Sequence, residues 1–305
     1  MKLHTLTDKF LLAYTGVYSP KTVQWYKNRF KPLLQNCWDR DIHEINIDAL
    51  REQYALLVDK KTLYEAHPHD RKIIKKGYSK YTLHTFARAW KRLFTWAVEE
   101  EYLVNNPGKR LQLPRLPKPA PKAISRNAVM ELLRAAKSFS TKPERDYAII
   151  RFLASTNARV GGVAGLCIDD LDLENRSATV HEKGRGGSGN LRVVFFDTET
   201  AKALDIWLKT RKSINDNRVF ALSECGIYQM IERRANNVRV NGPYNPHSFR
   251  HSFAKETLRQ GANLAQVSQM MGHSSSVVTV EYYGQFATRE LQEFHDRYSW
   301  VPDSY

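Results

Sequence analysis

The sequence has few cysteines and no long apolar run. Its three cysteines, Cys37, Cys167 and Cys225, lie far apart and form no Cys-x-x-Cys pair. This spacing excludes a disulfide framework and a cysteine-based zinc knuckle, and it fits a reducing compartment. No apolar stretch approaches the roughly 18–20 residues that span a bilayer, and the first residues lack the apolar core of a signal peptide. We therefore expect a cytoplasmic protein.

Positive charge is in excess and is unevenly distributed. The 305 residues include 47 Lys and Arg against 32 Asp and Glu, a formal net charge of +15. Residues 1–122 hold 23 of the basic and 12 of the acidic residues, so most of the excess lies in this part. Such a chain suits a polyanion, with nucleic acid as the first candidate and an anionic membrane surface as the second. The distribution favours the N-terminal part as the module that grips it.

A proline-rich stretch at residues 113–124 divides the chain. Four prolines between Pro114 and Pro121 exclude a helix or a central strand and favour an extended linker. Residues 1–112 show helical periodicity only, whereas residues 125–305 mix helical patterns with short β-like runs. The predicted fold is mainly α: an all-α helical domain, followed by an α+β domain with a small antiparallel β-sheet.

Capping residues indicate where several helices begin. Ser19, Ser79 and Ser125 each precede an amphipathic pattern, and Asp48 is expected to cap a further helix. Further helices are predicted at about 144–155, 198–212, 223–235, 247–260 and 263–271, with strands at 170–172, 178–180 and 192–196.

Three side chains with phosphate or metal chemistry share the predicted helix at 247–260. A spacing of three and four residues places His247, Arg250 and His251 near one face. The two histidines could bind zinc, but a third ligand is missing from the sequence and Arg250 would repel the ion. Capping and core polar contacts are the structural alternative. Arginine as a fork for phosphate oxygens and histidine as a proton carrier are what metal-free phosphate-ester chemistry requires.

A glycine-rich stretch, Gly184–Gly189, happens to fit the pattern G-x-G-x-x-G. The dinucleotide-binding fingerprint requires a helix after it, whereas a strand follows here, which excludes that cofactor. We expect a hairpin with Lys183 at the end of its first strand and Arg185 near its tip. Arg159 follows an apolar helix at a turn, from which a side chain can reach a cleft.

Four segments together resemble the sequence boxes of tyrosine recombinases of the phage-integrase and Xer type. In chain order they are Thr156-Asn157-Ala158-Arg159, His181-Glu182-Lys183-Gly184 with Arg192, His247-Ser248-Phe249-Arg250-His251, and Met271-Gly272-His273 with Thr279 and Tyr282. The sequence departs from the boxes where Gly162 replaces an acidic residue that supports the active site, Asn157 replaces glycine and Phe249 replaces leucine. Tyr282 stands nine residues after His273, which favours it over Tyr283 as the nucleophile.

The resemblance implies a site-specific DNA recombinase or integrase that cuts and rejoins strands through a 3′-phosphotyrosyl intermediate. It implies no metal, no ATP and no other cofactor. The implied catalytic residues are Arg159, Lys183, His247, Arg250, His273 and the nucleophile Tyr282. The candidate DNA contacts are Lys75, Lys76, His84, Arg88, Lys91, Arg92 and Arg185.

The resemblance also implies an organisation and a set of partners. Residues 1–112 would be a core-binding domain that grips DNA, and residues 125–305 a catalytic domain with a C-terminal tail. The partners would be double-stranded DNA, three further copies in a DNA-bound tetramer, and accessory DNA-bending proteins, with no membrane partner. The setting would be the nucleoid of a prokaryote, or a phage or other mobile element. Two alternatives stay open, a type IB topoisomerase and a DNA-binding protein that has lost catalysis.

Overall fold

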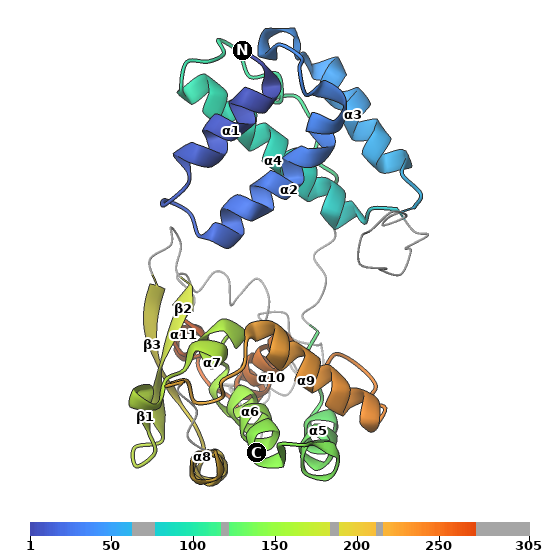
Figure 1. Ribbon diagram of the computed structural model, residues 1–305. Helices are drawn as coiled ribbons and strands as arrows, with labels where there is room; N and C mark the ends of the chain where they lie inside the picture. The colour runs from blue at the N-terminus through green and yellow to red at the C-terminus, as the bar shows by residue number, and fades with distance from the viewer. Residues whose placement is uncertain (63–76, 117–121, 184–188, 212–215, 273–305) are drawn as a thin grey trace, which may run out of the picture. The chain divides into compact units, whose positions relative to one another are not determined.

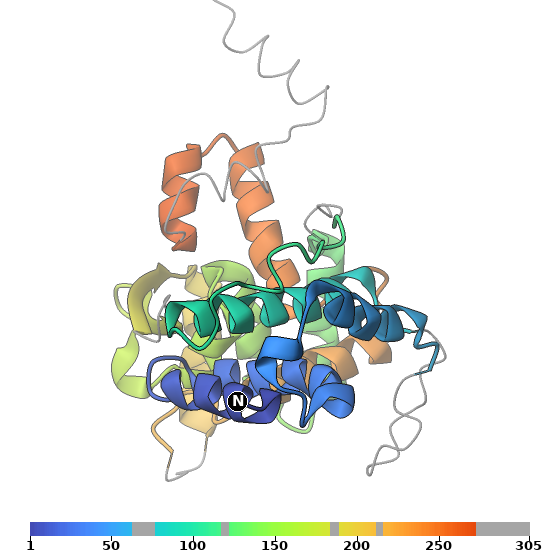
Figure 2. The same cartoon turned by 90° about the horizontal axis from the view of Figure 1, so that it is seen from above.

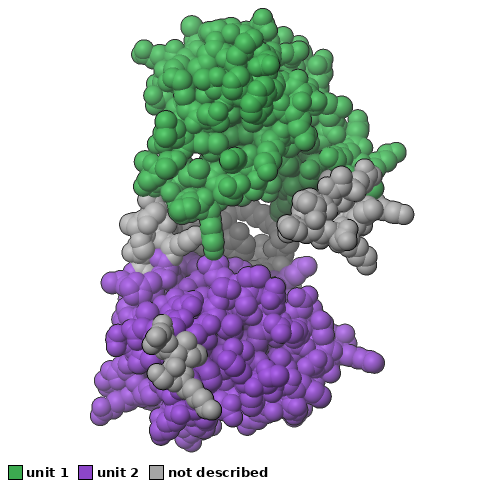
Figure 3. All heavy atoms as spheres, viewed as in Figure 1, with its two compact units in different colours: residues 1–118, 185–187 green, residues 119–184, 188–305 purple. Residues whose placement is uncertain are grey.

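The computed structural model describes residues 1–62, 77–116, 122–183, 189–211 and 216–272. The chain divides into two compact units, the first formed by Met1–Lys118 with Arg185–Gly187 and the second by the rest (Figure 3). The described residues are mainly helical and contain one small antiparallel sheet, which confirms the predicted fold class. Among them, no helix has both the length and the apolar character needed to cross a bilayer.

Unit 1 is all helical in its described part (Figure 1). Its elements are α1 (Leu3–Ala13), α2 (Pro20–Cys37), the 3₁₀ turn η1 (Ile42–Glu44), α3 (Ile47–Asp59) and α4 (Lys80–Glu99). The predicted serine caps are confirmed, since Ser19 and Ser79 accept hydrogen bonds from the backbone amides three residues later. The fully buried Trp90 on α4 donates its indole N–H to the carbonyl of Arg29 on α2, 3.0 Å away, so the aromatic core also fixes the helix pair.

Unit 2 contains the sheet and the remaining helices. Its elements are α5 (Arg126–Phe139), α6 (Pro143–Thr156), α7 (Val160–Gly165), η2 (Ile168–Asp170), β1 (Leu171–Asp172), β2 (Ser177–Lys183), β3 (Gly189–Phe195), α8 (Thr198–Thr210), α9 (Glu224–Asn237), α10 (Pro246–Arg259) and α11 (Leu264–Met271). The strands pair in the order β1-β2-β3, all antiparallel. Figure 2 shows α10 and α11 as neighbouring helices, and they are in contact.

Helix α6 is the centre of unit 2. Its residues Ala148, Ile149, Ile150, Phe152 and Leu153 are all fully buried, as expected of a helix covered on every side. It contacts α5, α8, α9 and α10. Because its C-terminal end therefore has a fixed position, the turn that follows it can hold side chains in a defined geometry.

The structure corrects two details of the sequence analysis. The cap of α3 is Asn46, whose side chain accepts from the Ala49 amide at 2.9 Å, and Asp48 lies inside the first turn. Helix α1 was not predicted, because Lys2 at its start offers no capping side chain. The expected C-terminal tail beyond residue 272 lies outside the described residues.

Candidate active site

Arg159 lies in the turn between α6 and α7. Asn157 ends α6 with a φ of 53°, a left-handed conformation that asparagine tolerates better than most residues. Two residues later, Arg159 immediately precedes α7 and has an extended backbone. The side chain of Arg159 remains 37% exposed, so its guanidinium can still reach a ligand.

A single buried carboxylate, that of Glu182 on β2, binds two arginines. It accepts a hydrogen bond from the Arg159 backbone amide at 3.0 Å and pairs with the Arg159 guanidinium. Its Oε1 also accepts from Arg192 Nη2 at 2.7 Å. Burial by itself would raise the pKa of Glu182, but the hydrogen bonds from Arg192 and Arg159 and their positive charges outweigh burial and hold it below its usual range. The carboxylate is therefore ionised at neutral pH. We call Glu182, Arg159 and Arg192 the carboxylate clamp.

Arg192 on β3 connects the clamp to two other parts of the unit. Its Nη1 donates to the side-chain oxygen of Asn157 at 2.9 Å and to the carbonyl of Met270 near the end of α11. Gly272, which ends α11 with a φ of 61°, lies against this arginine: a Cβ there would be 2.7 Å from Arg192 Cδ. Glycine is therefore required at 272 for two reasons, its backbone conformation and the close approach.

Arg250 on α10 is buried beside the same turn. Its Nη1 donates to the Asn157 carbonyl at 2.9 Å, and its Nη2 donates to the carbonyl of Met271. Asn157 thus accepts from Arg192 through its side chain and from Arg250 through its backbone. Asn157 therefore helps to position two guanidinium groups.

His247 lies in the first turn of α10, after the cap Asn245, whose side chain accepts from the Ser248 amide at 3.1 Å. Partial burial lowers the pKa of His247, and the positive charges of Arg250 and Arg159 lower it further. The pKa of His251 is also lowered, by burial first and then by the charges of His247 and Arg250. At neutral pH His247 is therefore a neutral imidazole beside two arginines and can accept a proton.

The remaining candidate catalytic residues are described in part or not at all. Lys183 is the last residue of β2, paired with Gly189, and only its strand position is described. His273 and Tyr282 lie outside the described residues, as do Lys75, Lys76 and Arg185. The structure therefore brings together Arg159, Arg250 and His247, with the backbone of Lys183 next to the clamp.

The other candidate DNA contacts lie on α4 and differ in their surroundings. Arg88 is exposed and its guanidinium stacks over the Trp25 ring, 5.5 Å from the centroid. Lys91 instead donates to the carbonyls of Lys109 and Leu111, and Arg92 pairs with Glu99 and Tyr14. His84 is half-buried on the same helix.

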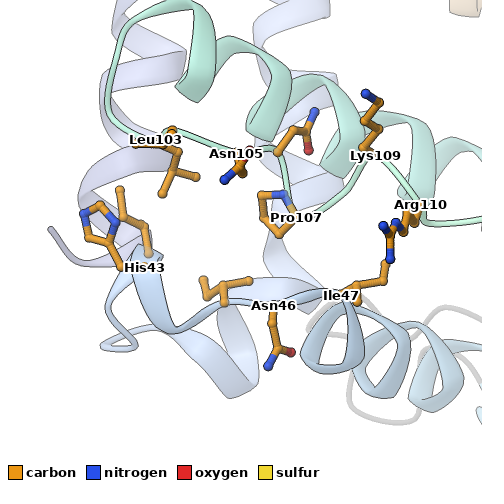
Figure 4. A pocket seen from close by; sticks show the side chains of 12 residues that line it. His43, Asn46, Ile47, Leu103, Asn105, Pro107, Lys109 and Arg110 are labelled. Atoms are coloured by element: carbon orange, nitrogen blue, oxygen red, sulfur yellow. The ribbon is translucent and has the colours of Figure 1, made fainter.

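A cavity of roughly 810 Å³ lies in unit 1, between the start of α3 and the segment after α4 (Figure 4). Its lining includes His43, Asn46, Pro107 and Arg110, and none of the lining residues is acidic. It contains none of the candidate catalytic residues. Within the described ranges, no cluster of three or more His, Cys, Asp or Glu side chains is arranged to hold a metal ion.

Sequence reasoning missed the roles of Glu182 and Asn157. Each was noticed only as part of a box, and Asn157 as a departure from it. The signal that could have identified Glu182 is the acidic residue missing at Gly162, since another acidic residue, Glu182, stands next to Lys183.

Comparison with known proteins identifies the family of the chain. Residues 122–289 match the phage integrase family. The tyrosine recombinase XerC of Corynebacterium glutamicum is 26% identical over 96% of this chain and 91% of its own length. XerC of Mycobacterium leprae is 30% identical over 72% of this chain and 78% of its own length. A Tn1549 transposon integrase, solved in complex with a circular intermediate DNA, has the same fold with a TM-score of 0.74 at 20% identity, over 97% of this chain and 99% of that one. The chain therefore belongs to the phage integrase family, the tyrosine recombinases that break and rejoin DNA strands at specific sites.

Proposed function

We propose that this recombinase cuts double-stranded DNA with the phenol of Tyr282. The Tyr282 oxygen forms a bond to the scissile phosphorus, the bond from phosphorus to the 5′-oxygen breaks, and a 3′-phosphotyrosyl ester results. A 5′-hydroxyl from a partner strand then reverses the reaction on a new junction. One ester replaces another, so bond energy is conserved and ATP hydrolysis is not needed.

The observation that carries the proposal is the convergence of Arg159, Arg250 and His247 around the α6–α7 turn. Phosphoryl transfer gathers negative charge on the non-bridging oxygens, and fixed guanidinium groups stabilise that charge. The neutral His247 is suited to take the proton from Tyr282, and His273 would add a donor to the phosphate. Lys183 would protonate the leaving 5′-oxygen.

The two units would share the work. Unit 1 carries most of the positive excess, and we assign it the gripping of the duplex. Arg88 lies over the Trp25 ring of α2, and Arg92 lies over the ring of Tyr14, the residue that follows α1. Unit 2 would hold the catalytic residues. Because two DNA sites must meet for exchange, the active form would be a DNA-bound tetramer, aided by DNA-bending proteins where the site requires them. The setting would be the bacterial cytoplasm, at the nucleoid.

Covalent trapping tests the proposal. The full chain is incubated with a library of nicked duplexes whose arms are randomised, and protein–DNA adducts that survive denaturation are isolated and sequenced. We expect an adduct with the native chain and with Tyr283→Phe, and none with Tyr282→Phe. Adduct loss in Tyr283→Phe alone would move the nucleophile by one residue, and an absence of adducts altogether would favour a binding protein.

A second assay separates recombination from topoisomerase activity. Two labelled duplexes that carry the selected site are mixed with the chain, and hybrid products are measured beside relaxation of a supercoiled plasmid. A recombinase joins the two duplexes, whereas a type IB topoisomerase only relaxes the plasmid.

A further inference from the structure

Glu182 is one of the few charged side chains that are buried in the described part of unit 2. Only 4% of its side chain is exposed, and both of its oxygens are occupied by Arg159 and Arg192. Burying a carboxylate is unfavourable unless its partners satisfy it, and here they do. Its two guanidinium partners would repel each other without the negative charge between them. The carboxylate therefore determines where the Arg159 guanidinium points.

Gly162 on α7 lies directly against this side chain. A Cβ at position 162 would lie 3.2 Å from the Val180 Cβ and 3.5 Å from the Glu182 Cγ. A Cβ at residue 162 would be in tight contact with Val180 and in ordinary van der Waals contact with Glu182, so little space is left there for a longer side chain. A side chain at 162 would enter the space that Glu182 now fills, one helical turn beyond Arg159.

We infer that Glu182 is a positioning residue for DNA cleavage, and that Gly162 is the residue that makes room for it. The space beside Arg159 holds one carboxylate, supplied in this chain by β2 and not by α7. Through the clamp, Glu182 aims Arg159 at the phosphate and keeps Arg192 bound to Asn157 and to the end of α11. This inference rests on the proposed function, because it assumes that Arg159 acts on a phosphate.

The test compares single-turnover adduct formation on a trapped nicked duplex with DNA affinity and thermal unfolding, all with the full chain. Glu182→Gln keeps the shape of the side chain and removes its charge. We expect adduct formation to slow by about 100-fold, as for a misplaced catalytic group, with DNA affinity within about threefold. Glu199→Gln is the matched control, since it removes an exposed carboxylate of α8 that pairs with Lys202, and it should keep the native rate.

Moving the carboxylate separates positioning from a purely structural role. Glu182→Ala combined with Gly162→Glu supplies the charge from α7 in place of β2. We expect this double variant to form adducts at least tenfold faster than Glu182→Ala alone. Gly162→Glu alone should be slower than the native chain, because two carboxylates would compete for one space.

Each outcome decides between the two proposals. A native chain that forms no adduct on any nicked duplex removes the proposed function and this inference with it. A native chain that cleaves while Glu182→Gln cleaves equally fast removes this inference only. Where Glu182→Gln does not fold, the double variant decides: cleavage restored above Glu182→Ala supports the positioning role, and cleavage not restored overturns it.

Discussion

Arg250 Nη1 donates a 2.9 Å hydrogen bond to the carbonyl of Asn157, 93 residues earlier in the chain. With its second bond, to the carbonyl of Met271, Arg250 connects α10 both to the turn before Arg159 and to the end of α11. The planar fork of arginine makes this pair of bonds, and a lysine ammonium would not reproduce it. The position of one guanidinium thus depends on three helices.

The first prediction concerns this fork. We expect Arg250→Lys to slow covalent cleavage by about 100-fold or more, because a point charge cannot replace a planar donor at the transition state. Single-turnover adduct formation measures the rate, and circular dichroism checks folding. Lys255→Ala, at an exposed position of the same helix, is the control and should cleave normally. A native rate in Arg250→Lys would contradict the prediction.

The second prediction concerns Gly272 and Arg192. Gly272→Ala places a Cβ 2.7 Å from Arg192 Cδ in addition to straining a backbone with φ of 61°. We expect a loss of about 1–3 kcal/mol of unfolding free energy together with slower cleavage, because Arg192 must move.

Gly242→Ala serves as the control for Gly272→Ala. Gly242 also has a positive φ, of 107°, but has no heavy atom within 4 Å of the added Cβ. The Gly242→Ala variant should have a lower unfolding free energy than the native chain and the same cleavage rate per folded molecule. Equal cleavage rates in the two variants would show that the contact with Arg192 does not matter.

The third prediction concerns pH. Burial and the charges of Arg250 and Arg159 lower the pKa of His247, so its neutral form persists below the usual histidine value of about 6.5. We expect adduct formation to fall towards acidic pH with its half-maximal point below about 6.5, because the protonated imidazole cannot accept a proton. His247→Gln should lose this acidic limb. A native rate already halved at pH 7 would be the opposite result.

The lowered pKa of His247 also affects the unfolding free energy of the protein. Because the unfolded chain binds a proton to His247 more readily than the folded chain, the contribution of this group to stability decreases as pH falls through about 6.5. Urea unfolding at several pH values would show a smaller decrease in His247→Gln than in the native chain.

The fourth prediction separates two basic residues of α4. Arg88→Ala should weaken DNA binding and reduce the slope of log affinity against log salt by about 1, as the loss of one phosphate contact does. Lys91→Ala should instead lower the unfolding free energy by ~2 kcal/mol, because its ammonium donates to the Lys109 and Leu111 carbonyls. A salt titration of binding and a thermal melt distinguish the two.

Much of the fold could be predicted from local patterns. Ser19, Ser79 and Ser125 mark helix starts because a cap acts on amides only two or three residues away. The same locality explains the error at α3, where Asn46 and Asp48 are both capping residues and the sequence alone does not choose between them.

The candidate site could be predicted only as a set of residue types. The partners of Glu182 lie 23 and 10 residues away, and those of Arg250 lie 93 and 21 residues away. No local periodicity contains such pairs, since they depend on how α6, β2 and α10 pack. The boxes named Arg159, His247 and Arg250, but the carboxylate of Glu182 that binds Arg159 and Arg192 became visible only in three dimensions.

The closeness of Gly162 to the Glu182 side chain limits the order in which substitutions can accumulate. A lineage that shifts the acid from one element to the other must pass through an ancestor with both groups crowded together, or through one with neither and two arginines left facing each other. We expect each step alone to be less favourable than the two together. Positions 162 and 182 should therefore change together. A library that randomises one of the two positions at a time should yield few active variants at either position.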